Sequence, residues 1–180
     1  MTTPWSQDEY LETYTFAASA HLGQEVPGSE LPYIVHVNLV TMEVIAALRA
    51  EPDRDESLAV RCALLHDVLE DTAVSHEEIE RRFGAAVAAG VRALSKNDAL
   101  EKSARMADSL RRIREQPREV WMVKLADRIT NLQPPPAHWT KEKIGRYLNE
   151  AEVIRAALRD ASPFLHARLQ NKMKTYATRA

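Results

Sequence analysis

The segment Ala63-Leu64-Leu65-His66-Asp67-Val68-Leu69-Glu70-Asp71-Thr72 places four ionisable side chains at the end of an otherwise apolar stretch. Residues four apart share one face of a helix, so a helix here would put His66 next to Glu70 and Asp67 next to Asp71. Such groups beside alanine and leucine are costly to bury unless a divalent cation neutralises them. A His-Asp pair alone is a weak signal, because two-residue motifs recur by chance and acidic groups at a helix end are usually solvated.

The sequence on both sides of this segment has the 3.6-residue period of amphipathic helices. Ser6, Thr140 and the Ser75-Glu78 pair are suitable N-terminal caps, and prolines and glycines separate the periodic segments. No convincing strand is present, since the β-like run 120–123 has helix-compatible neighbours and no hairpin turn. The expected fold is a single all-α domain over residues 1–180, with helices over 7–20, 33–50, 55–69, 76–83, 85–94, 103–116, 118–132, 140–158 and 163–176.

Composition excludes several classes of protein. The five glycines form neither a GxGxxG nor a GxxxxGKS pattern, so no glycine loop is expected to bind phosphate. Cys62 is the single cysteine, which rules out a disulfide framework and a zinc site built on several thiolates. A net charge of −2 gives no bulk attraction to nucleic acid, and no stretch approaches a membrane span. With no secretory signal visible, we expect a cytoplasmic protein.

Two further segments place polar groups among apolar residues. Pro32-Tyr33-Ile34-Val35-His36 puts His36 near the start of a helix, on a face that should turn inward. In the segment 123–132, Asp127 has apolar neighbours and Asn131 lies four residues later on the same face. Taken singly, His36 is equally well interpreted as a core histidine, and Asp127 as the partner of a neighbouring basic residue, either Lys124 or Arg128.

Taken jointly, the three segments supply two imidazoles and two carboxylates from three helices: His36, His66, Asp67 and Asp127. Two nitrogen and two oxygen ligands without a thiolate suit Mn²⁺, Fe²⁺ or Zn²⁺. The sequence therefore predicts a metal site shared by these helices.

The H…HD…D pattern and its surroundings resemble the hydrolase domain of RelA/SpoT-type proteins, which are HD-domain metal phosphohydrolases that degrade the alarmones ppGpp and pppGpp. The resemblance covers about residues 10–160, and Trp139 and Tyr147 match a Trp…Tyr pair of the small, hydrolase-only members. It implies an HD-domain bundle of about eight to ten helices, without the synthetase domain of the long members. The matching segments, in order and spacing, are 18–24, 32–36, 64–72, 83–84 and 124–132.

The resemblance also implies roles for individual residues. Glu70 and Asp71 match a pair that orients and deprotonates the attacking water, which makes them the candidate catalytic residues. Asn131 matches a residue that contacts the nucleotide sugar, and Tyr147 matches one that lines the phosphate end of the pocket. The metal, usually Mn²⁺ and less often Fe²⁺ or Zn²⁺, is held in the family by the residues that match His36, His66, Asp67 and Asp127.

The remaining candidate substrate contacts are basic residues. Lys143 and Arg146 belong to the same predicted helix as Tyr147, where either would meet the 5′-phosphates, although both also suit an ordinary solvated helix face. The loop 25–31 lacks the basic pair with which family members usually contact the base and the pyrophosphate. Lys96 is the candidate replacement for that pair.

The expected function is Mn²⁺-dependent hydrolysis of the 3′-pyrophosphate of guanosine alarmones, which yields pyrophosphate with GDP or GTP and lowers the stringent-response signal. The expected partner is a small nucleotide, neither a nucleic acid nor a membrane. The missing basic pair leaves two alternatives open. One is another nucleotide substrate, such as the adenosine alarmone pppApp or NADPH, and the other is a non-catalytic nucleotide-binding module.

Overall fold

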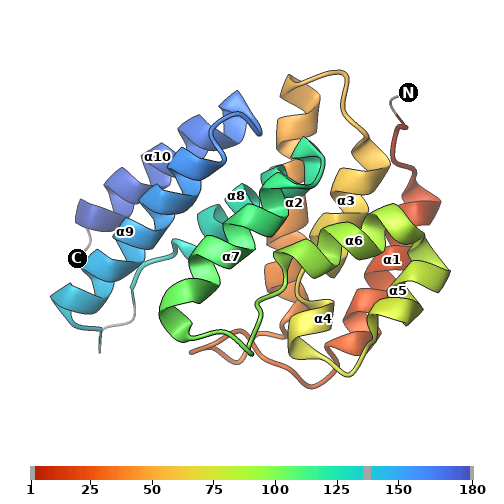
Figure 1. Cartoon of the computed structure of the whole chain (residues 1–180), viewed down its shortest axis with the longest axis horizontal. Helices are drawn as coiled ribbons and strands as arrows, with labels where there is room; N and C mark the ends of the chain where they lie inside the picture. Colours follow the sequence, from red (N-terminus) through yellow and green to blue (C-terminus); the bar gives the residue numbers. More distant parts are fainter. Residues whose placement is uncertain (1–2, 136–138, 179–180) are drawn as a thin grey trace.

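The computed structural model describes residues 3–135 and 139–178. These residues form ten helices and no strand, apart from one isolated bridge between Glu25 and Pro32, so the all-α prediction is confirmed (Figure 1). The helices are α1 (Gln7–Ala20), α2 (Ile34–Ala50), α3 (Glu56–Leu65), α4 (Val68–Asp71), α5 (His76–Phe83), α6 (Ala85–Leu94), α7 (Lys102–Arg114), α8 (Arg118–Asn131), α9 (Lys141–Ala157) and α10 (Pro163–Thr178).

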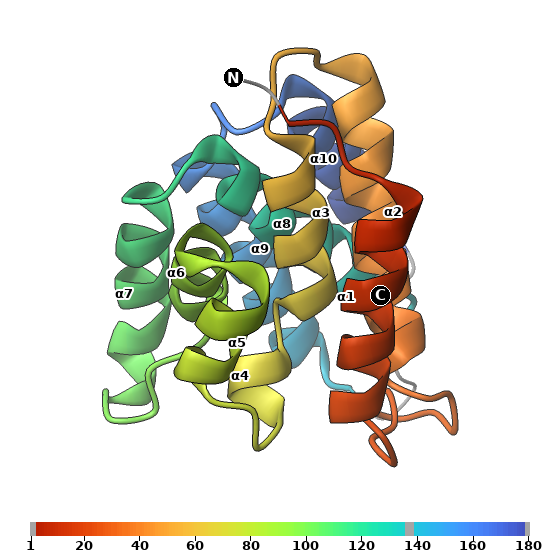
Figure 2. The ribbon, with the colours of Figure 1, turned by 90° about the vertical axis from the view of Figure 1, so that its right-hand side faces the viewer.

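Helix α8 is the centre of the bundle. It packs against α2, α3, α6, α7, α9 and α10, and Val120, Met122, Val123 and Ile129 are completely buried. This burial on nearly all sides explains why the β-like run 120–123 is helical, because tertiary packing outweighs local strand preference. Helix α3 lies between α1 and α6 (Figure 2). None of the helices within residues 3–135 and 139–178 is long and apolar enough to span a bilayer.

The predicted N-terminal caps are present. Ser6 and Glu9 form a reciprocal capping box at the start of α1. The Ser75 hydroxyl accepts a hydrogen bond from the Glu78 amide, and Thr140 caps α9 in the same way. Each cap satisfies an amide that the first turn of a helix leaves unpaired, so these boundaries follow from local sequence.

The predicted helix over 55–69 is wrong at its C-terminal end. Helix α3 ends at Leu65, and a turn at His66 and Asp67 separates it from α4. The His66 Nδ1 donates to the Ala63 carbonyl at 2.8 Å, which is the acceptor that the Asp67 amide would use in a continuous helix. His66 and Glu70 therefore do not belong to one continuous helix, whereas Asp67 caps α4 and its carbonyl accepts the Asp71 amide at 2.9 Å, one helical turn away.

Gly90 lies where α6 approaches α3 and α8, and a substitution at this residue tests how closely these helices pack. A Cβ atom at residue 90 would lie 2.7 Å from the Cys62 Sγ and 2.9 Å from the Val120 Cγ2. We expect Gly90→Ala to lower the free energy of unfolding by about 1–3 kcal/mol, because both neighbours are rigidly buried. Gly145→Ala is the control, since a Cβ there meets nothing within 4 Å, and alanine should stabilise α9 by up to about 1 kcal/mol. Urea denaturation measures both, and equal stabilities would contradict the packing.

Candidate metal centre and cavity

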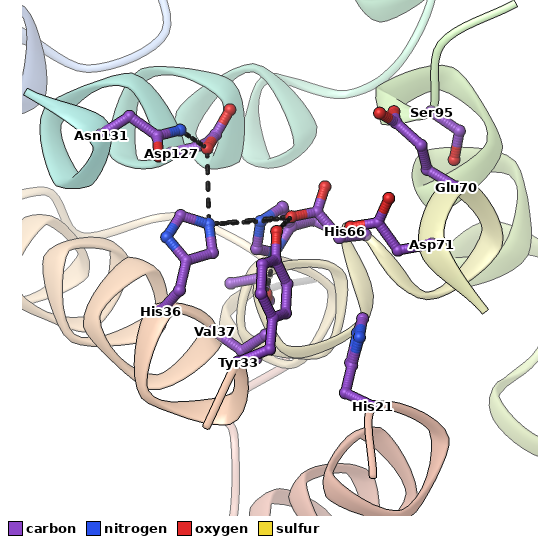
Figure 3. A network of polar contacts seen from close by, with 12 residues as sticks. His21, Tyr33, His36, Val37, His66, Glu70, Asp71, Ser95, Asp127 and Asn131 are labelled. Atoms are coloured by element: carbon purple, nitrogen blue, oxygen red, sulfur yellow. Dashed lines mark hydrogen bonds and ion pairs between the residues drawn. The ribbon is translucent and has the colours of Figure 1, made fainter. Parts of the chain in front are cut away.

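Four side chains from three separate segments of the chain lie close together, and Figure 3 labels three of them, His36, His66 and Asp127. His36 comes from the first turn of α2, His66 and Asp67 from the turn between α3 and α4, and Asp127 from α8. The two imidazole Nε2 atoms are 3.3 Å apart, and the His66 Nε2 is 2.9 Å from the Asp67 Oδ2. The His36 Nε2 is 3.7 Å from that oxygen and 3.6 Å from the Asp127 Oδ1. We call these four residues the His–Asp cluster.

The hydrogen bonding of His66 suits a metal ligand. The Ala63 carbonyl can only accept, so the His66 Nδ1 carries a hydrogen and the Nε2 lone pair of the neutral ring faces the cluster. Donor atoms of His36, His66 and Asp67 lie within 4.8 Å of one another, close enough to bind a single ion. The residues present therefore fit a divalent cation with nitrogen and oxygen ligands.

The pKa values of the cluster favour a bound positive charge. Burial opposes protonation of His66, but the Asp67 carboxylate outweighs it and raises the pKa of His66 to about 9. Burial also opposes ionisation of Asp67, yet the His66 imidazole and the Tyr33 hydroxyl hold the pKa of Asp67 well below its usual range. At His36, burial dominates and lowers the pKa. Asp67 thus attracts positive charge to His66, and a divalent cation bound at the cluster would supply that charge.

Neighbouring side chains hold the two carboxylates of the cluster. The Tyr33 hydroxyl donates to the Asp67 Oδ2 at 2.5 Å. Lys124 Nζ lies 3.0 Å from the Asp127 Oδ2, and the Asn131 amide donates to the Asp127 Oδ1 at 2.5 Å. Asp127 therefore has the basic partner that the alternative interpretation required and also faces the imidazoles. Tyr33 and Lys124 are further site residues that no motif indicates, although each precedes a cluster residue by three positions, a spacing typical of one helix face.

The cluster opens into a cavity of about 480 Å³. A larger hollow of about 710 Å³ runs along α1, but it contains no cluster residue, whereas His66, Asp67 and Asp127 line the smaller cavity. The predicted substrate residues Lys96, Asn131 and Tyr147 line this cavity, together with Arg128, which the sequence analysis left without a site role. The buried Arg128 guanidinium lies 4.5 Å from the centre of the Tyr147 ring.

Glu70 and Asp71 line the same cavity, and both are held from outside α4. The Lys96 backbone amide donates to the Glu70 Oε2 at 2.9 Å, and the Lys96 ammonium forms an ion pair with the other carboxylate oxygen. The Asp71 Oδ2 accepts a hydrogen bond from the Gln24 Nε2 at 3.2 Å.

The structure places Lys143 and Arg146 elsewhere. Both are exposed on α9, and within the described residues neither lines the cavity. The Lys143 Nζ lies 4.0 Å from the centre of the Trp139 ring, which occupies it in a cation–π contact.

Comparisons with known proteins show the family of this chain. The family model described as HD domain matches residues 13–161, so the chain belongs to the HD domain family. The protein named guanosine-3′,5′-bis(diphosphate) 3′-pyrophosphohydrolase MESH1 of Danio rerio is 31% identical over 165 residues, which cover 89% of each chain. The bifunctional (p)ppGpp synthase/hydrolase SpoT of Escherichia coli is 35% identical over 128 residues, which cover 68% of this chain and 17% of SpoT.

A solved structure shares the whole arrangement of helices. It comes from work on a metazoan ortholog of SpoT that hydrolyses ppGpp and plays a role in starvation responses. It superposes with a TM-score of 0.81 and is 28% identical, covering 96% of this chain and 98% of that one.

Proposed function

We propose that this chain is a metal-dependent hydrolase of the alarmones ppGpp and pppGpp, which releases pyrophosphate from the ribose 3′ position and leaves GDP or GTP. The observation that carries the proposal is the His–Asp cluster, of which His66, Asp67 and Asp127 line a cavity together with Glu70 and Asp71. The Danio rerio relative is named for this reaction, and the alignment with it covers 89% of its length, which supports the proposal. A cytoplasmic location and a role in lowering the stringent-response signal belong to the same proposal.

The His–Asp cluster would hold a divalent cation, Mn²⁺ in this proposal ahead of Fe²⁺ or Zn²⁺, which supplies Lewis acidity at the phosphate. Glu70 and Asp71 would orient a water in the cavity and accept its proton. The water oxygen bonds to the phosphorus attached to the ribose O3′, the bond between that phosphorus and O3′ breaks, and O3′ takes up a proton. Asn131 and Tyr147 line the cavity where the sugar and its phosphates would bind.

Incubation of the purified protein with Mn²⁺ and ppGpp tests the proposal. We expect GDP and pyrophosphate in equal amounts, as resolved by ion-exchange chromatography, and no release of single phosphates. An Asp67→Ala variant provides the background rate. If the wild-type protein and this variant produce the same trace of GDP, the proposed activity is wrong.

The loop 25–31 favours a second class of substrate. It contributes Pro27 to the cavity but has no basic residue, so the part of the substrate that lies against it meets no cation. We therefore propose pppApp and NADPH as alternative substrates to be assayed under the same conditions. The ratio of kcat/KM for ppGpp and pppApp decides whether the protein selects guanine.

Lys96 is the exposed cation at the mouth of the cavity, and we expect it to bind the substrate phosphates. Lys96→Met should raise the KM for ppGpp about tenfold, because one charge-assisted hydrogen bond contributes about 1.4 kcal/mol. The effect on kcat should be smaller, since the backbone amide of residue 96 still holds Glu70. Initial-rate kinetics measure both constants, with the exposed Lys174→Met as control. An unchanged KM would show that Lys96 serves Glu70 alone.

A further inference from the structure

His21 is buried at the C-terminal end of α1, with only 4% of its surface exposed, and none of the steps above uses it. Its ring centre lies 4.9 Å from that of Tyr33, and its Nδ1 lies 2.7 Å from the Gln24 Oε1. In Figure 3 the ring points from the end of α1 toward Asp71. His21 thus contacts the amide side chain that holds Asp71.

His21, Gln24 and Asp71 form a chain of hydrogen bonds. The direction of these bonds follows from Asp71, the last residue. The Asp71 carboxylate can only accept, so the Gln24 side chain must turn its Nε2 toward Asp71 and its Oε1 toward His21. An amide oxygen also only accepts, so the His21 Nδ1 must carry a hydrogen. The His21 Nε2 is buried without a partner among the described residues, so no hydrogen bond there competes for the other tautomer.

The backbone around Gln24 keeps this chain in place. The Gln24 amide donates to the His21 carbonyl at 3.0 Å, and the Gln24 carbonyl accepts from the Tyr33 amide at 2.9 Å. Gly23 permits the tight turn with a φ of 83°. The backbone thus fixes where the Gln24 side chain begins, and the contact with His21 restricts its amide end.

Asp71 needs such support because its own element is weak. Helix α4 has four residues, and Asp71 is its last and is exposed. The neighbouring Glu70 is held from the opposite side by Lys96. Gln24 binds the Asp71 Oδ2, and in the proposed reaction the Oδ1 would be left to bind a water in the cavity.

We propose that His21 and Gln24 are positioning residues for the Asp71 carboxylate, with His21 acting only through the Gln24 amide. The inference rests on the proposed function, in which Asp71 orients the attacking water. It predicts that loss of the His21 donor slows the chemical step while leaving substrate binding and the metal unaffected.

Two variants separate the hydrogen bond of His21 from its packing. Phenylalanine keeps a ring against Tyr33 but has no donor, whereas the asparagine amide nitrogen occupies the position of Nδ1. We expect His21→Phe to lower kcat about tenfold or more, with KM within about twofold, and His21→Asn to restore most of kcat. His76→Phe on α5, outside the cavity, is the matched control, and thermal melting and metal content establish that each variant is folded and loaded.

A double-variant cycle tests whether His21 acts on Asp71 through Gln24. If His21 acts only through Gln24, the double variant His21→Phe/Gln24→Ala is no slower than Gln24→Ala alone. The inference is wrong if His21→Phe turns over as fast as the wild-type protein, if His21→Asn is as slow as His21→Phe, or if the two losses simply add.

Nuclear magnetic resonance of ¹⁵N-labelled metal-free protein gives a readout that does not depend on turnover. The ¹⁵N shifts of His21 should show the tautomer with hydrogen on Nδ1, and the Nε2-protonated tautomer would overturn the hydrogen-bond chain. A wild-type protein that hydrolyses none of the nucleotides above overturns the proposed function, whatever the tautomer of His21. An active wild-type protein with a fully active His21→Phe variant overturns only the role of His21.

Discussion

Asp67→Asn is expected to lose both bound metal and hydrolysis. The Asp67 Oδ2 lies within 3.7 Å of both imidazole Nε2 atoms of the cluster and accepts a hydrogen bond from the Tyr33 hydroxyl. This oxygen therefore contacts both histidines of the proposed metal site. Asparagine has nearly the same shape but no negative charge, and a neutral amide cannot compensate a divalent cation in a site with so few ligands. We expect kcat/KM for ppGpp to fall by at least about a thousandfold.

Metal analysis separates this effect from misfolding. The wild-type protein should retain about one Mn²⁺ per chain after gel filtration, and Asp67→Asn should retain less than about a tenth of that. Asp160→Asn is the matched control, because Asp160 is an exposed residue outside the cavity and pairs with Arg159. A variant at residue 67 that keeps its metal and its rate would remove Asp67 from the ligand set.

Glu70→Gln is expected to lower kcat by about a hundredfold to a thousandfold and to keep its metal. Glutamine can still accept the Lys96 backbone amide, so the side chain stays in place at the cavity wall. It cannot accept a proton from water, and the loss should therefore appear in kcat rather than in KM.

The controls for this variant lie in the same region of the chain. Glu77→Gln, at an exposed position in the first turn of α5, should leave the rate unchanged. Asp71→Asn measures how much the second carboxylate contributes to kcat. Gln24 holds this carboxylate, whereas Lys96 holds Glu70. Loss of metal from Glu70→Gln would make Glu70 a ligand, and an unchanged kcat would remove it from the reaction.

The structure gives a second reason, besides composition, to exclude a thiolate metal site at Cys62. The thiol is completely buried between α3 and α6, and burial raises its pKa to about 12. A neutral thiol is a poor metal ligand, so imidazoles and carboxylates are left for any metal chemistry in this chain. The side chain instead fills the core beside Gly90.

Much of the fold could be predicted because helix boundaries depend on residues within one turn. Ser6, Ser75 and Thr140 cap helices that begin where the pattern indicates, and Gly84 with a φ of 89° ends α5. The turn at His66 and Asp67 could not be predicted this way. The apolar period runs through it without interruption, whereas the His66 ring that bonds to the Ala63 carbonyl is buried beside His36 of α2, a contact between distant residues.

The sequence by itself determined the types of residue available for chemistry: six histidines, many carboxylates and a single cysteine. Tertiary structure decided which of them meet. Lys96 lies against Glu70, Tyr33 against Asp67 and Gln24 against Asp71, while Lys143 turns to Trp139. The physical reason is the distance along the sequence, because periodicity and caps depend on interactions between residues only a few positions apart. Contacts between α2, α4 and α8 exist only once the apolar faces of the bundle have packed together.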